Sequence, residues 1–349
     1  MKALFYERGS SIDSMKKLKI SIKFMKRFTF TFSDVVWHKI YEPLLRRSRI
    51  FRTFVVWYSY AKRRNSVRPV PKEILINKEG YINYNIDPDW FTQKKKLGIS
   101  GVTRLKNSAD FLERVVEAFL PYLDEIVLVA EQATDGTNEI CERLAQTYPD
   151  KVKYFFYPFT IRFRDYDGED QPTSDSIASF AYFTNWAFSQ TTYKYVMRLD
   201  DDIFPIPETW EKMRKYILEK EPNEYLLYYG VNLLARWNCY GVMTKIPRCG
   251  TWGDNGIYPV SEYSYFTQII GSTEAFHLNL LYKPFWFGYL HLKNLKKWFW
   301  TLDYQHSEWG KYFQKLSKNS SVGEFHDYID FPSSRIYEIL INNHIIWIR

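Results

Sequence analysis

Short apolar runs alternate with amphipathic segments between residues 97 and 220. Apolar runs rich in β-branched and aromatic residues predict strands at 97–102, 125–130, 152–157 and 195–199. Segments with a single apolar stripe predict helices at 108–120, 137–148 and 174–189. This alternation predicts an α/β fold with an open, mostly parallel sheet, whose ligands bind beyond the carboxyl ends of the strands.

The strand predicted at 195–199 is followed at once by Asp200, Asp201 and Asp202. Pro205 cannot donate to a strand ladder, so the pattern predicts a turn there and then a helix at 208–219. Adjacent carboxylates repel one another unless a cation neutralises them, and oxygen ligands suit Mg²⁺ or Mn²⁺. A solvated acidic loop, or acidic residues favoured by a helix N-terminus, is the alternative interpretation.

A second polar turn follows the strand predicted at 125–130 and runs from Glu131 to Thr137. Gly136 can supply the backbone conformation of this turn. Parallel strands end at the same edge of a sheet, so the pattern predicts that both acidic turns lie there.

The charge distribution sets the first 70 residues apart. Residues 1–70 contain 17 Lys and Arg against 4 Asp and Glu, whereas the rest of the chain contains 31 against 36. Basic residues mix with large apolar residues over 15–64, a composition that suits an anionic membrane surface. Packing on the main domain with a solvated basic face is an equal alternative. No nucleic acid partner is expected, because no base-reading module follows.

The apolar runs and the cysteines bear on the location of the protein. No run approaches the roughly 18–20 apolar residues of a membrane-spanning helix, and the N-terminus lacks a signal-peptide core. Cys141, Cys239 and Cys249 share no metal-binding spacing, so neither a zinc site nor a disulfide framework is indicated. These features predict a cytoplasmic protein, peripheral on the cytoplasmic face of a membrane.

The patterns divide the chain into four regions. They are a basic aromatic extension at 1–70, a linker at 71–96, a regular half at 97–220, and a second half with the C-terminal region at 221–349. The second half is the less regular in pattern.

Three sequence blocks carry a resemblance to a known family. They lie at 102–107, 126–137 and 199–202, and the last of them contains an Asp-x-Asp pair after a strand. In this order they resemble the nucleotide-binding half of GT-A fold glycosyltransferases, family-2-like, over about residues 97–220. The chain departs from the family pattern at Ala130 and Gln132.

The resemblance implies a nucleotide-sugar-binding half at 97–220 and an acceptor-binding half at 221–349, and it also implies roles for individual residues. Glu131 would contact the base or ribose, Asp135 would shape that pocket, and Asp202 would bind the metal. The full set of implied donor-binding residues is Thr103, Arg104, Asn107, Glu131, Asp135, Asp200, Asp201 and Lys293. The implied metal ligands are Asp202, Asp200 and His291, with Mn²⁺ or Mg²⁺ as the cofactor. For His291, a buried structural histidine is the alternative.

Sugar transfer from a nucleotide needs further chemistry. Negative charge grows on the leaving diphosphate, and a divalent ion stabilises it as a Lewis acid. An inverting enzyme also needs a carboxylate base beside the attacking hydroxyl. The resemblance makes Glu274 the predicted base, because acceptor-side acids in that family commonly follow a small-residue turn and open a helix, and Asp254 is the second candidate.

The resemblance therefore implies a metal-dependent, inverting, hexosyltransferase-like enzyme. Its donor would be a nucleotide sugar, and its acceptor a hydroxyl of a cell-surface polysaccharide or a lipid-linked glycan. Two alternatives stay open: a sugar nucleotidyltransferase, and a non-catalytic scaffold that binds polyanions or membranes and keeps a degenerate transferase domain. The first would need a glycine-rich phosphate loop, and 103–107 contains no glycine.

Overall fold

The structure is a computed structural model that describes residues 68–162, 172–232, 256–268, 274–292, 296 and 338–339. All of them belong to the compact unit Thr53–Arg349. The predicted extension at 1–70 lies outside the described residues except for its last three, so its membrane role stays a prediction. Within the described part, no helix has both the length and the apolar character needed to cross a bilayer.

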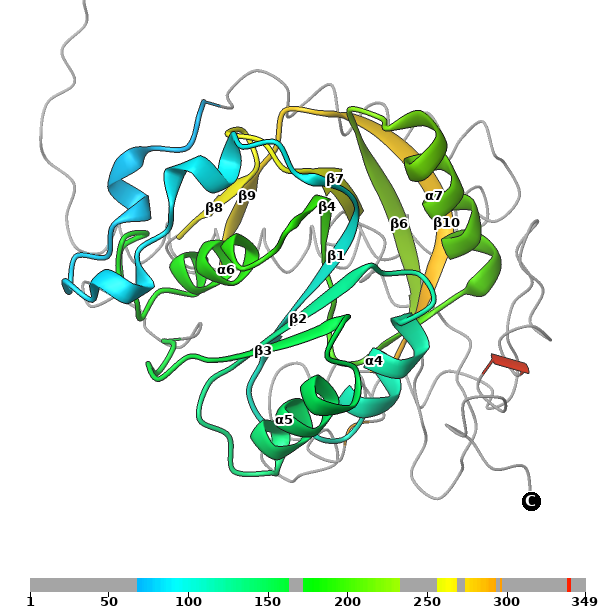
Figure 1. Cartoon of the computed structure of the whole chain (residues 1–349), viewed down its shortest axis with the longest axis horizontal. Coiled ribbons are helices and arrows are strands. Elements are labelled where there is room, and N and C mark those ends of the chain that lie inside the picture. Colours follow the sequence, from blue (N-terminus) through cyan, green and yellow to red (C-terminus); the bar gives the residue numbers. More distant parts are fainter. Residues whose placement is uncertain are drawn as a thin grey trace, which may run out of the picture. The chain divides into compact units, whose positions relative to one another are not determined.

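An eight-stranded sheet forms the centre of the described residues (Figure 1). In spatial order the strands are β3 (Val152–Phe156), β2 (Glu125–Ala130), β1 (Lys96–Leu105), β4 (Tyr193–Arg198), β7 (Gly256–Pro259), β6 (Glu224–Asn232), β10 (Leu281–His291) and β5 (Ile203–Pro205). Strand β7 is antiparallel to both β4 and β6, and β5 is antiparallel to β10. The other six strands run in one direction. The predicted mostly parallel α/β sheet is confirmed.

Both faces of the sheet are covered. Helices α4 (Leu112–Phe119), α5 (Thr137–Thr147) and α7 (Pro207–Lys220) pack on one face. The other face carries α6 (Phe180–Ser189), the two-stranded sheet of β8 (Tyr265–Thr267) and β9 (Ala275–His277), and three short 3-10 helices at Lys72–Leu75, Ile82–Tyr84 and Pro88–Phe91. Figure 1 shows α6 beside β8. Successive residues of β2 enter opposite cores, which explains its unbroken apolar sequence.

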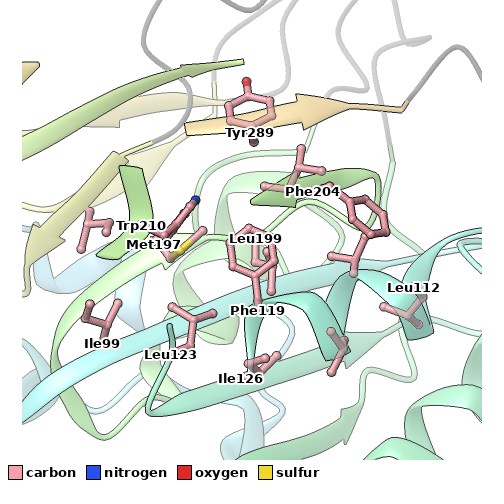
Figure 2. Packing of buried hydrophobic residues seen from close by; sticks show 14 of the residues in the cluster. Ile99, Leu112, Phe119, Leu123, Ile126, Met197, Leu199, Phe204, Trp210 and Tyr289 are labelled. Carbon is pink, nitrogen blue, oxygen red and sulfur yellow. The ribbon is translucent and has the colours of Figure 1, made fainter. Parts of the chain in front are cut away.

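Trp210 fixes the helix that follows the acidic turn. Its indole is fully buried and lies edge-on to the Phe119 ring, with 4.9 Å between the ring centroids. The indole N–H also donates to the Gly288 carbonyl at 2.8 Å. Figure 2 shows Trp210 packed among apolar residues that include Met197 and Leu199 of the segment before the turn. Core packing thus holds the segments on both sides of Asp200–Asp202.

Several predicted boundaries differ from the structure. Helix α4 begins at Leu112 rather than at residue 108, and β4 spans Tyr193–Arg198 rather than 195–199. Strand β1 continues through Leu105, where a loop was expected from residue 103, because β2 pairs with it as far as that residue. Pro205 ends a short strand, β5, which is tolerated because β5 is an edge strand. Helix α6 begins at Phe180 rather than near residue 174, and the Ser179 hydroxyl caps it by accepting the Tyr182 N–H.

Candidate active site

The two predicted turns lie at one edge of the sheet. Strand β2 ends directly before Glu131, and β4 ends just before the acidic turn. Strand β1 pairs in parallel with both, so the ends of all three are neighbours. Ser108, in the turn after β1, joins the two acidic turns. Its N–H donates to Thr137 Oγ1 at 2.7 Å, and its side chain lies close enough to Asp201 to act against the rise in the pKa of that carboxyl.

Asp135 holds the turn after β2 against the turn after β1. Its carboxylate accepts the N–H of Thr137 at 3.1 Å and that of Ala109 at 2.9 Å. Burial acts to raise the pKa of Asp135, but these hydrogen bonds outweigh it and the pKa lies below its usual value. Gly136 has φ of 90°, a conformation that other residues rarely adopt. Asn107 Oδ1 accepts a further N–H from the same turn at 2.9 Å. Asp135 and Asn107 thus fix the shape of the turn after β2, and their contact with a nucleotide stays a prediction.

Glu131, the predicted nucleoside contact, is buried with 7% of its surface exposed. Its Oε2 accepts the Ile161 N–H at 2.9 Å and the Lys106 ammonium at 3.1 Å. The Lys106 side chain is half-exposed, so the lysine of this ion pair is in contact with solvent while the carboxylate is buried. On the neighbouring strand β1, the Thr103 hydroxyl is buried and has no hydrogen-bond partner in the described part of the chain. Glu131 is therefore a carboxylate held in place by the chain at the sheet edge.

Asp202 meets two basic side chains. Strand β5 begins at Ile203, which pairs with His291 at the end of β10, so the preceding Asp202 lies beside that histidine. His291 Nε2 is 3.2 Å from Asp202 Oδ1. Lys296 Nζ lies 3.1 Å from Asp202 Oδ2 and 2.8 Å from Asp201 Oδ2. Each carboxylate oxygen of Asp202, a predicted metal ligand, therefore lies beside a side-chain nitrogen.

Burial and charge oppose each other in this turn. Burial alone would raise the pKa of Asp202, but His291 and Lys296 outweigh it and hold that pKa well below its usual range. Burial likewise disfavours the Lys296 ammonium, but Asp202 and Asp201 raise the Lys296 pKa above its usual value. For Asp201, burial and the adjacent Asp202 raise the pKa although Lys296 acts against them. The result is an ionised Asp202 held against a protonated Lys296.

Asp202 and His291 have the spacing of two ligands on one ion. Octahedral Mg²⁺ binds its ligands at about 2.1 Å, which places neighbouring ligand atoms about 3 Å apart. Asp200, the other predicted ligand, faces Arg198 instead, whose Nε lies 3.3 Å from its Oδ1. The described residues contain no group of three or more His, Cys, Asp or Glu that could hold a metal. Asp202 and His291 therefore fit as two protein ligands, with the other positions left for water and donor oxygens.

Glu274, the predicted base, lies in a buried network with two arginines. Arg104 Nη1 donates to both of its oxygens at 3.1 Å, and Arg198 Nη1 lies 3.4 Å from Oε1. Thr184 Oγ1 donates to Oε2 at 2.7 Å. The Glu274 and Arg104 side chains are each only 8% exposed. Arg198 also contacts Asp200, so this network continues to the acidic turn.

The structure brings together most of the predicted site residues and adds others that the patterns did not indicate. Asp254 and Lys293 lie outside the described residues, so their roles stay predictions. The unforeseen residues include Ser108, Arg198 and Lys296. Arg198 stands two residues before Asp200, and Lys296 follows His291 by five residues, but neither spacing is specific enough to predict these contacts.

Two solved structures are among those similar to this chain. The glucosyl-3-phosphoglycerate synthase of Mycobacterium tuberculosis, solved with Mn²⁺, uridine-diphosphate-glucose and phosphoglyceric acid, matches at 17% identity with a TM-score of 0.26. That match covers 38% of this chain and 43% of the other, so the chain spans less than half the length of that protein. TarS 1-349 of S. aureus matches at 13% identity with a TM-score of 0.36, covering 71% of both chains.

Comparison of sequences identifies the family. No curated protein sequence matches this chain. A family model described as beta-1,4-N-acetylgalactosaminyltransferase (CgtA) matches residues 46–225, slightly more than half of the chain. The match spans β1 to α7 and therefore includes both acidic turns. It confirms the predicted glycosyltransferase and decides against the nucleotidyltransferase alternative. This chain belongs to the CgtA family of glycosyltransferases.

Proposed function

We propose that this glycosyltransferase moves a sugar from a nucleoside-diphosphate donor to a hydroxyl acceptor, with inversion and with a divalent ion. The observation that carries the proposal is the meeting of two acidic turns at one sheet edge. One turn holds Glu131, and the other places Asp202 Oδ1 3.2 Å from His291 Nε2. A nucleoside and a metal-bound diphosphate are the two parts of a donor that such neighbouring turns would bind.

The chain's own groups suit this reaction. Bound Mn²⁺ or Mg²⁺ would stabilise the charge that grows on the leaving diphosphate. Asp202 and His291 would hold that ion, and Glu131 would orient the nucleoside at the end of β2. Burial of Asp202 strengthens its attraction for a cation, because the electrostatic screening by water is weak there.

The base of the reaction is best sought outside the Glu274 network. Arg104, Arg198 and Thr184 all contact the Glu274 carboxylate, so both of its oxygens already accept hydrogen bonds within the chain. A general base needs a lone pair directed at the acceptor hydroxyl. Asp254 is therefore the base that we propose to test first, with Glu274 in second place.

The family description suggests the sugar. It names a β-1,4-N-acetylgalactosaminyltransferase, so N-acetylgalactosamine is the first donor sugar to test for this chain. The proposed acceptor is a glycan hydroxyl, either on a lipid-linked precursor or on a cell-surface polysaccharide.

A donor screen by thermal unfolding tests this function. Nucleotide-linked N-acetylgalactosamine, N-acetylglucosamine, galactose and glucose should be compared with Mn²⁺ and with a chelator. A ligand present at 100 times its Kd stabilises the folded state by about 2.7 kcal/mol, so the cognate donor should raise Tm clearly and only with metal. If no nucleotide sugar raises Tm with Mn²⁺ or Mg²⁺, the transferase reaction is rejected and the non-catalytic scaffold is favoured.

A further inference from the structure

Lys296 brings a buried ammonium group onto the carboxylates of the acidic turn. Its side chain is 9% exposed, and its Nζ lies within hydrogen-bond distance of both Asp201 Oδ2 and Asp202 Oδ2. The chain thus supplies a cation of its own where a divalent ion is proposed to bind. The acidic turn without an added metal is already partly neutralised.

The two cations would share one carboxylate. His291 lies at Asp202 Oδ1, so an ion held by Asp202 and His291 would occupy that side, while Lys296 holds Oδ2 of the same group. Asp202 is 5% exposed, and repulsion between cations so placed is poorly screened by water or salt. The ammonium would therefore oppose the binding of a divalent ion on its own.

A nucleoside diphosphate reverses this effect. Its phosphate oxygens add negative charge between the ion and the ammonium, and a lysine binds phosphate as a point charge through several hydrogen bonds. We propose that Lys296 couples the two ligands, so that the divalent ion binds well only together with the diphosphate. This role rests on the proposed donor chemistry and assigns to Lys296 a contact with the donor phosphates.

Binding measurements on Lys296→Met test the coupling without any turnover. Calorimetry would give the Kd of Mn²⁺ alone, and the Kd of uridine diphosphate or of the diphosphate of the donor identified in the screen, at saturating Mn²⁺. We expect the variant to bind Mn²⁺ alone about tenfold more tightly and the diphosphate about tenfold more weakly, which is within the usual range of coupling between two ligands. A lysine that merely supports the turn would weaken both.

Lys212→Met serves as the control, because it removes an exposed ammonium from α7 and should change neither Kd. Lys296→Gln gives a second variant that can still hydrogen-bond Asp201 and Asp202, and it should show the same opposite shifts if the methionine variant does not fold. Unchanged or equally weakened binding of both ligands in a folded variant would overturn the role of Lys296 alone. A wild-type protein that binds neither ligand would instead overturn the proposed function, and this role with it.

Discussion

Replacing Asp202 with asparagine is expected to lower kcat/KM for sugar transfer by roughly 100- to 1,000-fold, the usual cost of losing one electrostatic contact to the transition state. The amide has nearly the shape of the carboxylate and can still hydrogen-bond, but it lacks the charge that would hold a divalent ion between Asp202 and His291. Initial rates at saturating Mn²⁺, with the donor identified by the screen, measure the effect.

Asp150→Asn provides the matched control, since Asp150 is an exposed carboxylate at the end of the α5–β3 connection. It should retain wild-type rates. Circular dichroism would show whether Asp202→Asn is folded. A folded Asp202→Asn variant with nearly wild-type, metal-dependent turnover would reject the proposed metal role of Asp202.

Replacing Glu274 with glutamine is expected to lower the free energy of unfolding by about 3–5 kcal/mol, the cost of removing one partner of a buried ion pair. The change leaves two guanidinium groups, Arg104 and Arg198, against a neutral amide in a site that is almost closed to water. Urea denaturation followed by circular dichroism gives the unfolding free energy directly.

The control for this change is Glu219→Gln, which breaks an exposed ion pair with Lys215 on α7. Its effect should stay below about 0.5 kcal/mol. The two possible roles of Glu274 predict different results. A folded Glu274→Gln variant of wild-type stability that has lost turnover would contradict the supporting role and restore Glu274 as the catalytic base.

The strands of the sheet could be predicted from the sequence where both faces are buried. The run at 125–130 is apolar throughout because alternate residues enter two different cores, and β2 has these same bounds. The helices with a single apolar stripe were also predicted, and Trp210, Met213 and Ile217 all lie in the core. In both cases burial leaves a signal in the local sequence: an unbroken apolar run for the strand and an apolar stripe for the helix.

The misplaced strand boundaries at residues 103 and 205 have a common physical cause. Thr103 and Arg104 are polar, so the sequence predicts a loop there, yet pairing with β2 keeps them in β1. Pro205 lies in a strand only because β10 approaches it from a distant part of the chain. Long-range pairing thus overrides local propensity, and periodicity carries no information about it.

The site could be predicted only where its residues follow strands that the sequence itself predicts. Glu131 follows β2 directly and Asp202 lies in the turn after β4, so the rule for parallel sheets places both at one edge. The pairing of Arg104 with Glu274 spans 170 residues, and the contact of Lys296 with Asp201 spans 95. Such contacts depend on how distant segments pack, which a single sequence does not encode in its spacing.

Pulsed electron paramagnetic resonance of the wild-type protein with Mn²⁺ and a nucleoside diphosphate tests the central claim most directly. If the two turns form one donor site, a single bound Mn²⁺ will show coupling both to ³¹P of the diphosphate and to ¹⁴N of an imidazole. The nitrogen coupling should disappear in His291→Ala, and Asp202→Asn should abolish the complex. Mn²⁺ that couples to phosphorus but keeps the same nitrogen signal in His291→Ala, or that binds equally well to Asp202→Asn, would contradict this account.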